Sequence, residues 1–270
     1  MNTKKNIFFI IAFVSFLTSF GILSESDCSG EPEGAGRAFH DNTKLNLKNV
    51  FGSLLQFKSQ PPMTKRYKGH KMVSLPKPNF TGEPFEETLK KRRSVRGYTE
   101  DSITLLELSQ LLFAAQGITG HEQGYELRAA PSAGALYPME IYVAAIRVEG
   151  LKPGIYHYAA DSHALELVKS GDFKGKLIDA SLEQEMVGQA AATFIITSIF
   201  ERATYKYEER GYRYAYIEAG HISQNLFLQA TSLGLGSVCV GAFFDDKINK
   251  LIDVDGNKEA AIYIHCVGRK

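Results

Sequence analysis

The sequence predicts an α+β protein in which helices flank a central mixed β-sheet. Three observations lead to this fold class. Apolar, β-branched runs such as residues 192–200 (ATFIITSIF) predict buried strands. Segments with helical periodicity lie between these runs in an irregular order and do not form a βα repeat. Residues 214–233 are helical in length and apolar on nearly every side, which predicts a long helix buried all round, in the core or at a subunit interface.

The N-terminal part of the chain carries targeting and linker signals. Lys4 and Lys5 precede an uncharged apolar run at residues 7–23, which is the pattern of an export signal or an N-terminal anchor. We assign residues 1–26 to this signal and expect an exported, periplasmic or extracytoplasmic protein that is either released or anchored to the membrane. Cys28 leaves lipidation open as a third fate of the N-terminus.

Residues 27–82 are rich in Gly, Ser and Pro, with an acidic start, so we expect a linker and an extended arm. One short helix is expected near residues 45–57. The folded domain is expected at residues 83–270. Its helices are predicted at residues 84–92, 102–116, 175–184 and 246–252, and its strands at residues 140–148, 154–159, 164–169, 237–243 and 260–267. Thr104 and Glu107 have the spacing of a capping box for the second of these helices.

Composition excludes several classes of function. The formal net charge is +1 and the pI is about 7.7, so the chain is not a generally basic protein that binds nucleic acid. The histidines have no metal-binding spacing, and no metal site is expected. The three cysteines lack a CxxC spacing, which favours free thiols and leaves a Cys239–Cys266 bridge as the alternative.

Residues 90–96 (KKRRSVR) form a local cationic cluster on this nearly neutral chain. Such a cluster suggests a small anionic partner, and the alternative is a solvated helix end. Arg92, Arg93, Ser94 and Arg96 supply the forked donors and the hydroxyl that bind phosphate well.

Three further segments strengthen the prediction of a ligand site. Residues 130–140 (APSAGALYPME) combine small residues and two prolines, residues 234–243 (GLGSVCVGAF) lead from a helix into a strand, and residues 267–270 (VGRK) return a cation after the last strand. Together with RRSVRGY and KYEERGYRYAYIEAGHISQNL, these segments resemble the nitroreductase-like FMN flavoproteins. The resemblance covers about residues 85–270 and is greatest to dehydrogenases of the SagB/ThcOx type.

The resemblance implies a nitroreductase-like fold and an FMN site. It implies that Arg92, Arg93, Ser94 and Arg96 bind the phosphate, the ribityl chain and the ring edge. The loop residues Pro131, Ser132, Ala133 and Ala135 match a segment that usually comes from the other subunit of a homodimer and covers the flavin. Val240, Gly241 and Ala242 match the backbone that faces N5, and Arg269 matches a late basic residue at the phosphate.

Lys206 and Tyr207 are the candidate catalytic residues, because a Lys–Tyr pair is assigned to proton removal in azoline-oxidising relatives. The alternative is that they belong to a charged helix start at which the tyrosines simply pack. Glu218, His221 and Asn225 share one helix face and could form a polar network. His221 is expected to be a hydrogen-bonded core residue.

The sequence therefore predicts an FMN-dependent oxidoreductase that works by ping-pong hydride transfer through flavin N5. The substrate is expected to be a small molecule or a peptide azoline, and NAD(P)H is the candidate electron donor for a nitroreductase-type reaction. The alternative is a non-enzymatic exported protein that binds flavin or another anion.

Overall fold

The computed structural model describes residues 34–44, 59–122 and 124–270. The chain divides into two units, residues 1–42 and 43–270. The described part of the first unit contains helix α2 (Ala35–Asn42). The expected signal at residues 1–26 and the expected helix near residues 45–57 lie outside the described residues. Among the residues described, no helix is both long and apolar enough to cross a membrane.

The second unit contains a seven-stranded sheet with the strand order β1-β6-β5-β4-β7-β9-β8. Its strands are β1 (Met72–Ser74), β4 (Met139–Ala145), β5 (Gly154–Ala159), β6 (Ala164–Ser170), β7 (Ala192–Ile199), β8 (Gly236–Val240) and β9 (Glu259–Gly268). A separate hairpin is formed by β2 (Ile118–Glu122) and β3 (Tyr125–Arg128).

All named strands of the large sheet pair antiparallel. Parallel pairing is limited, within the described residues, to two isolated bridges, Ser94–Ser237 and Ile103–Val148. The α+β class is therefore confirmed, whereas the mixed pairing expected of the sheet is wrong for its strands. Short connections join β4 to β5 and β5 to β6, and such connections produce antiparallel pairs.

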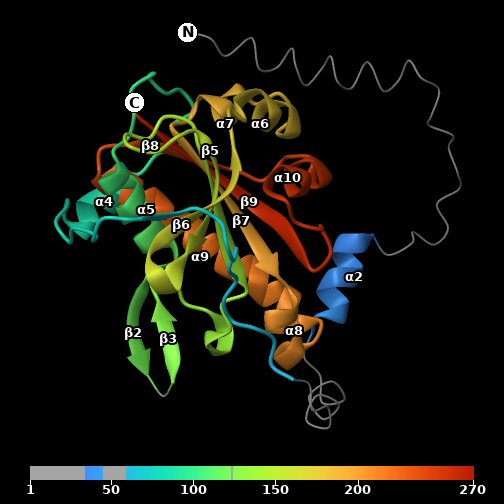
Figure 1. Ribbon diagram of the computed structural model, residues 1–270. Coiled ribbons are helices and arrows are strands. Elements are labelled where there is room, and N and C mark those ends of the chain that lie inside the picture. Colours follow the sequence, from blue (N-terminus) through green and yellow to red (C-terminus); the bar gives the residue numbers. More distant parts are fainter. Residues whose placement is uncertain (1–33, 45–58, 123) are drawn as a thin grey trace, which may run out of the picture. The chain divides into compact units, whose positions relative to one another are not determined.

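Helices cover both faces of this sheet (Figure 1). The helices of the second unit are α4 (Phe85–Lys91), α5 (Leu105–Gln116), α6 (Lys174–Ala180), α7 (Glu185–Gln189), α8 (Glu201–Tyr207), α9 (Arg210–Ser232) and α10 (Asp245–Ile252). Helices α5 and α9 bury their apolar side chains in one core cluster, and α6, α7 and α10 bury theirs in the other.

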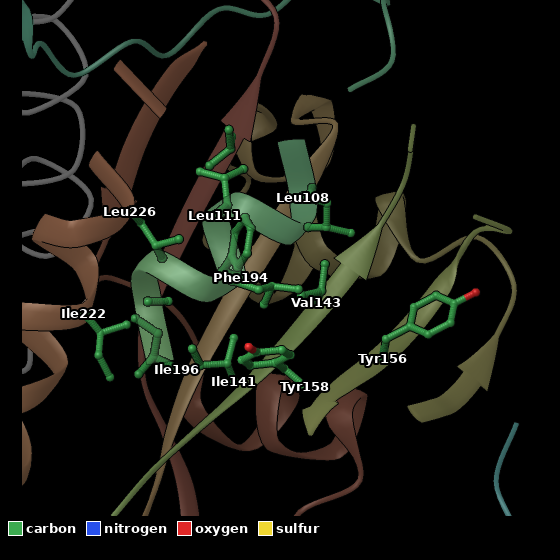
Figure 2. Packing of buried hydrophobic residues seen from close by; sticks show 14 of the residues in the cluster. Leu108, Leu111, Ile141, Val143, Tyr156, Tyr158, Phe194, Ile196, Ile222 and Leu226 are labelled. Carbon is green, nitrogen blue, oxygen red and sulfur yellow. The ribbon is translucent and has the colours of Figure 1, made fainter. Parts of the chain in front are cut away.

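Alternation along the strands creates these two cores. On β4, Ile141 and Val143 face the α5–α9 side, and Tyr142 and Ala144 face the opposite side. Figure 2 shows the first cluster: side chains of α5 and α9 gather over the sheet residues. The labelled members are Leu108, Leu111, Ile222, Leu226, Ile141, Val143, Phe194, Ile196, Tyr156 and Tyr158. Every strand at the centre of the sheet is thus covered on both faces.

Helix α9 is the long helix that the sequence predicted at residues 214–233, but it is buried on one side only. Ala215, Ala219 and Ile222 are buried. Tyr216 and Ile217 are 47% and 50% exposed. Within one chain the core therefore covers only one side of α9, and apolar composition does not reveal which side of a helix meets the sheet. Burial of the other side at a subunit interface stays a prediction.

The arm before Glu83 is packed onto the sheet. Strand β1 pairs with β6, and Leu75 belongs to the first core cluster. Lys65 forms an ion pair with Glu259 on β9 at 2.5 Å. The backbone N–H of Tyr67 donates to Glu166 on β6 at 3.1 Å. The packed body therefore begins before residue 83, where the dense domain was expected to start.

Candidate active site

The cationic cluster at residues 90–96 divides into paired and unpaired charges. Lys90 and Lys91, at the end of α4, lie 4.0 Å from Glu87 and 2.8 Å from Glu83. By contrast, no ion pair is formed by Arg92, Arg93 or Arg96 within the described parts of the chain. These three guanidinium groups, which have no carboxylate partner among the described residues, lie within five residues of one another, where they could hold an anion.

The arginine segment runs beside edge strand β8 (Figure 1). The backbone N–H of Val95 donates to the carbonyl oxygen of Ser237 at 2.8 Å, and Ser94 bridges to Ser237. The guanidinium of Arg92 lies 5.1 Å from the centre of the Phe227 ring on α9. The aromatic ring attracts the cation without neutralising it, so Arg92 keeps its positive charge for a ligand.

Val240, Gly241 and Ala242 lie at the far end of β8. Gly241 lies four positions after Ser237, so the two are about 13 Å apart at roughly 3.3 Å per residue of strand. Gly241 and Ala242 are exposed. The Gln184 side chain donates to the carbonyl oxygen of Ala242 at 2.9 Å and so fixes the turn. The predicted phosphate and ring segments therefore lie along one strand, at an extended spacing.

Arg269 lies near the arginine segment, but its charge is shared with a carboxylate. Its carbonyl oxygen accepts a hydrogen bond from the backbone N–H of Thr99 at 3.0 Å. Its guanidinium donates to Glu107 at 2.8 Å and to the carbonyl oxygen of Ser102 at 3.2 Å. Glu107 also caps α5 through Thr104, as the capping box predicted. The structure thus places Arg269 as a link between β9 and the start of α5.

The predicted flavin-covering loop is tightly folded. Gly134 and Ala135 have φ values of 64° and 53°, within the left-handed region. The Ser132 hydroxyl accepts from the backbone N–H of Tyr137 at 2.9 Å and donates to Glu218 at 2.5 Å. Of the predicted loop residues, Pro131 is exposed, and Ala133 and Ala135 are half-buried. The loop is therefore anchored to α9 through a single serine.

Lys206 and Tyr207 lie against this loop. A Cβ atom at Gly134 would lie 2.6 Å from the Tyr207 hydroxyl and 3.0 Å from the Lys206 ammonium. The ammonium is 5.4 Å from the centre of the Tyr207 ring, which packs edge-on against Tyr214 at 4.9 Å. The structure thus brings together the candidate acid–base pair and the loop, which are far apart in sequence.

Within one chain, the loop and the arginine segment contact different parts of α9. The loop bonds to Glu218, and Arg92 stacks on Phe227, nine residues further along the helix. At 1.5 Å of rise per residue, these positions are about 13 Å apart along the axis. We call the loop with Lys206 and Tyr207 the first half-site, and the arginine segment with the end of β8 the second half-site.

The motifs predicted only part of the surroundings of Glu218. Glu218 is buried, as a member of a polar network should be, but His221 is exposed and is not the core histidine that was expected. Asn225 donates instead to the carbonyl oxygen of Ala114 at 2.9 Å. Gln116 and Arg128, which surround Glu218 from α5 and β3, had no motif that could have revealed them.

The second half-site also contains an unexpected contact. The Tyr263 hydroxyl donates a hydrogen bond to the sulfur of Cys239 at 2.8 Å, and Cys239 directly precedes Val240 in the sequence. Cys239 and Cys266 are both free thiols, as the sequence favoured. Cys239 pairs in register with His265, and Cys266 pairs with Val238, so the two cysteines do not lie opposite each other on β8 and β9.

The fold and these two half-sites define a protein of the nitroreductase-fold class. The chain belongs to the nitroreductase family, whose family model matches residues 89–269. A nitroreductase homologue from Methanocaldococcus jannaschii is 42% identical over 193 residues, which is 72% of this chain and 94% of that protein. The chain is accordingly a nitroreductase-family oxidoreductase.

Two other relatives extend the comparison. The microcin B17-processing protein McbC of Escherichia coli is 29% identical over 63% of this chain and 63% of its own length. A crystal structure of a nitroreductase homologue from Anabaena variabilis has a TM-score of 0.72 and 32% identity. The match covers 91% of this chain and 49% of that one, so the chain spans about half of the Anabaena protein.

Proposed function

We propose that this protein is an FMN-dependent oxidoreductase with a ping-pong mechanism. The observation that carries the proposal is the arrangement along β8. At one end lie three arginines that form no ion pair with any described carboxylate, and at the other lie the exposed residues Gly241 and Ala242. The separation of about 13 Å suits an elongated ligand with an anionic end and a planar end.

The residues at the first end fit a phosphate. Arg92, Arg93 and Arg96 offer forked N–H donors, and Ser94 offers a hydroxyl. Because Arg93 already donates to the carbonyl oxygens of Lys90 and Arg92, its side chain is held close to the turn. Arg269 is the weaker candidate of the set, since Glu107 competes for its guanidinium.

The chemistry of hydride acceptance and release at N5 would be supplied by FMN when it is bound. The protein would bind the phosphate with its arginines, and the backbone N–H groups at Gly241 and Ala242 would orient the ring. Loop residues Pro131, Ser132, Ala133 and Ala135 would cover the ring and exclude water.

Lys206 and Tyr207 would hold and release the proton that leaves the substrate while its hydride goes to the cofactor. Their position beside Gly134 supports this role, because the loop and the acid–base pair would then approach the substrate together.

A peptide azoline, oxidised by loss of a hydride and a proton, is the substrate class that we favour. The relationship to a microcin-processing protein supports a peptide substrate. The higher identity to the Methanocaldococcus homologue supports the second candidate, reduction of a nitro compound or quinone with NAD(P)H as donor.

The two half-sites support a homodimer, in which the loop of one subunit covers the cofactor held by its partner. The exposed side chains of Tyr216 and Ile217 on α9 provide an apolar surface for such an association. Export, with or without a membrane anchor, remains part of the proposal and rests on residues 1–26.

The test is the visible absorbance spectrum of the protein starting near residue 37, recorded anaerobically before and after adding NADH or NADPH. A flavin spectrum that bleaches supports the reaction with a nicotinamide donor. A flavin spectrum that persists supports an organic donor such as an azoline. A colourless protein that takes up no added FMN contradicts the proposal and leaves the arginine segment as a solvated surface.

A further inference from the structure

Glu218 is a buried carboxyl group that the proposed chemistry does not use. It lies in the middle of α9 and is 2% exposed. One carboxyl oxygen accepts from the Ser132 hydroxyl at 2.5 Å, and the other accepts from the Gln116 side chain at 3.3 Å. Within the described residues, no lysine, arginine or histidine forms an ion pair with it. Its hydrogen bonds within the described parts of the chain therefore come from two neutral donors.

The elements packed around Glu218 supply two charged groups. Arg128 on β3 and Arg202 on α8 face it, and Arg202 is itself paired with Glu140 on β4 at 2.6 Å. Arg128 donates to Gln116 at 3.4 Å. Gln116 carries no charge, and the phenol of Tyr137, under the Arg128 guanidinium, is the neighbouring titratable group of the loop. Despite the attraction of the two arginines, burial raises the pKa of Glu218 to about 7.

The Ser132 hydroxyl has two possible hydrogen-bonding arrangements. In both, its oxygen accepts from the backbone N–H of Tyr137. When Glu218 is ionised, the Ser132 proton must point inward to the carboxylate, since a carboxylate only accepts. When Glu218 is protonated, its own O–H can donate to Ser132. The Ser132 proton is then free to point out of the loop, because a hydroxyl oxygen can accept two bonds while it donates one.

We propose that Glu218 is a positioning residue whose protonation state decides whether Ser132 donates inward to α9 or outward to the bound flavin. The inference rests on the proposed function, because the acceptor of the outward bond is a flavin ring oxygen or nitrogen beneath the loop. Protonated Glu218 makes the loop a hydrogen-bond donor to the ligand, and ionised Glu218 makes the same position an acceptor only.

The acid–base pair lies beside the same turn, which keeps its backbone position when Ser132 rotates. Ser132 and Gly134 belong to one tight turn, and Gly134 contacts Tyr207 and Lys206. A serine that rotates toward the ligand leaves the backbone of this turn in place, because the Tyr137 N–H continues to hold the oxygen. The effect on the ligand is therefore a gained or lost hydrogen bond, and the fold of the loop is retained.

The experiment measures the dissociation constant of FMN by fluorescence quenching at pH values from about 5.5 to 8.5. For the wild-type protein we expect affinity to fall by about 2- to 10-fold as the pH rises through the region near 7, which corresponds to one hydrogen bond. Glu218→Gln keeps the shape of the side chain and cannot titrate, so it should lack this downward step in affinity. It should retain only the change caused by the FMN phosphate, which titrates at about pH 6 with every variant.

Three further variants make the result specific. Ser132→Ala retains Glu218 and removes the hydroxyl, so its affinity should be lower at low pH and lack the step. Ser132→Thr keeps the hydroxyl and should restore the step. Glu149→Gln makes the same chemical change at an exposed glutamate and should behave as wild type.

A fall in affinity near pH 7 that persists in Glu218→Gln or in Ser132→Ala would overturn the inference. Profiles of the same shape for the wild type and Glu218→Gln, with FMN bound, would overturn it as well. Ser132→Ala keeps the test valid if Glu218→Gln fails to fold. A wild-type protein that binds no FMN at any of these pH values would overturn the proposed function itself, and the two failures are therefore distinguishable.

Discussion

The Tyr207 hydroxyl lies where the side chain of any residue other than glycine at position 134 would begin. A Cβ atom there would be 2.6 Å from the hydroxyl oxygen, well inside the contact distance of the two atoms. Gly134 also has a φ of 64°, which a glycine adopts without strain. One glycine thus allows both the turn of the loop and its close approach to helix α8.

Replacing Gly134 and a control glycine should separate the effect of backbone strain from the effect of displacing Tyr207. Gly134→Ala should strain the backbone by about 1 kcal/mol or more and also displace Tyr207. Gly150→Ala is the matched control, because Gly150 has a φ of 76° and no atom near its Cβ position. In urea unfolding both variants should lose stability, but only Gly134→Ala should lose turnover. Equal turnover in the two variants would show that the Gly134–Tyr207 contact has no part in the reaction.

The arginines of residues 92–96 should contribute more to FMN affinity than the neighbouring lysines do. Arg96→Ala should weaken FMN binding about 10- to 100-fold, the loss expected for a hydrogen bond to a charged group. Lys91→Ala should leave the affinity unchanged, because Lys91 is paired with Glu83. Fluorescence titration measures both values. A larger loss for Lys91→Ala than for Arg96→Ala would mean that the anion is bound on the other side of the turn.

Lys206 and Tyr207 should affect turnover more than binding. Tyr207→Phe keeps the ring that packs on Tyr214 and removes the hydroxyl, so it should lower kcat about 10²- to 10⁴-fold if the hydroxyl transfers a proton. Tyr205→Phe, on the same helix, is the control. The flavin spectrum of each variant shows whether cofactor is retained. Full activity in Tyr207→Phe would restrict the residue to packing.

The buried ion pair of Arg202 and Glu140 should control stability in acid. Hydrogen bonding to His157 and the charges of Arg202 and His157 overcome the effect of burial and lower the pKa of Glu140 to about 2. Because the unfolded pKa is near 4.5, this stabilisation is present above pH 4.5 and is lost as the pH falls toward 2.

Glu140→Gln should therefore cost about 3 kcal/mol at neutral pH and reduce the acid sensitivity of the free energy of unfolding. Urea unfolding at several pH values measures the effect, with Glu149→Gln as the exposed control. A variant with the wild-type slope between pH 2 and 4.5 would contradict this assignment.

Glu218 should act on stability in the opposite direction. Its pKa is raised from 4.5 to about 7, so its favourable contribution is complete below pH 4.5 and is lost as the pH rises to about 7. The loss amounts to about 3 kcal/mol. Thermal unfolding of the cofactor-free protein should show this decline in the wild type but not in Glu218→Gln. An identical decline in both proteins would place the titrating group elsewhere.

The sequence predicted those elements whose signals are local. The Thr104–Glu107 capping box located α5, and the β-branched run at residues 192–200 located β7. It did not predict β1, which has three residues in a proline-rich segment, or α8 as a helix separate from α9. Composition alone did not reveal that the core of one chain leaves Tyr216 and Ile217 on α9 exposed.

The candidate site was predictable as a set of motifs but not as a geometry. The motifs included Ser132, Gly134 and Lys206, but their mutual contact depends on segments that are about 70 residues apart. The pairing of Lys91 with Glu83, which separates it from the arginines, also required the structure. Long-range contacts between polar groups leave no periodic signal in a sequence.

The position of β9 has a consequence for how this protein reaches its native state. β9 is the last described strand in the chain, yet it lies inside the sheet, between β7 and β8. Its first residue, Glu259, holds Lys65 across a separation of 194 residues. Until β9 has been made, β7 and β8 have no common neighbour and Lys65 lacks its partner Glu259. The sheet should therefore close only after β9 has left the ribosome, in a slow step dominated by non-local contacts. Until then the chain exposes apolar strand surface that chaperones could bind.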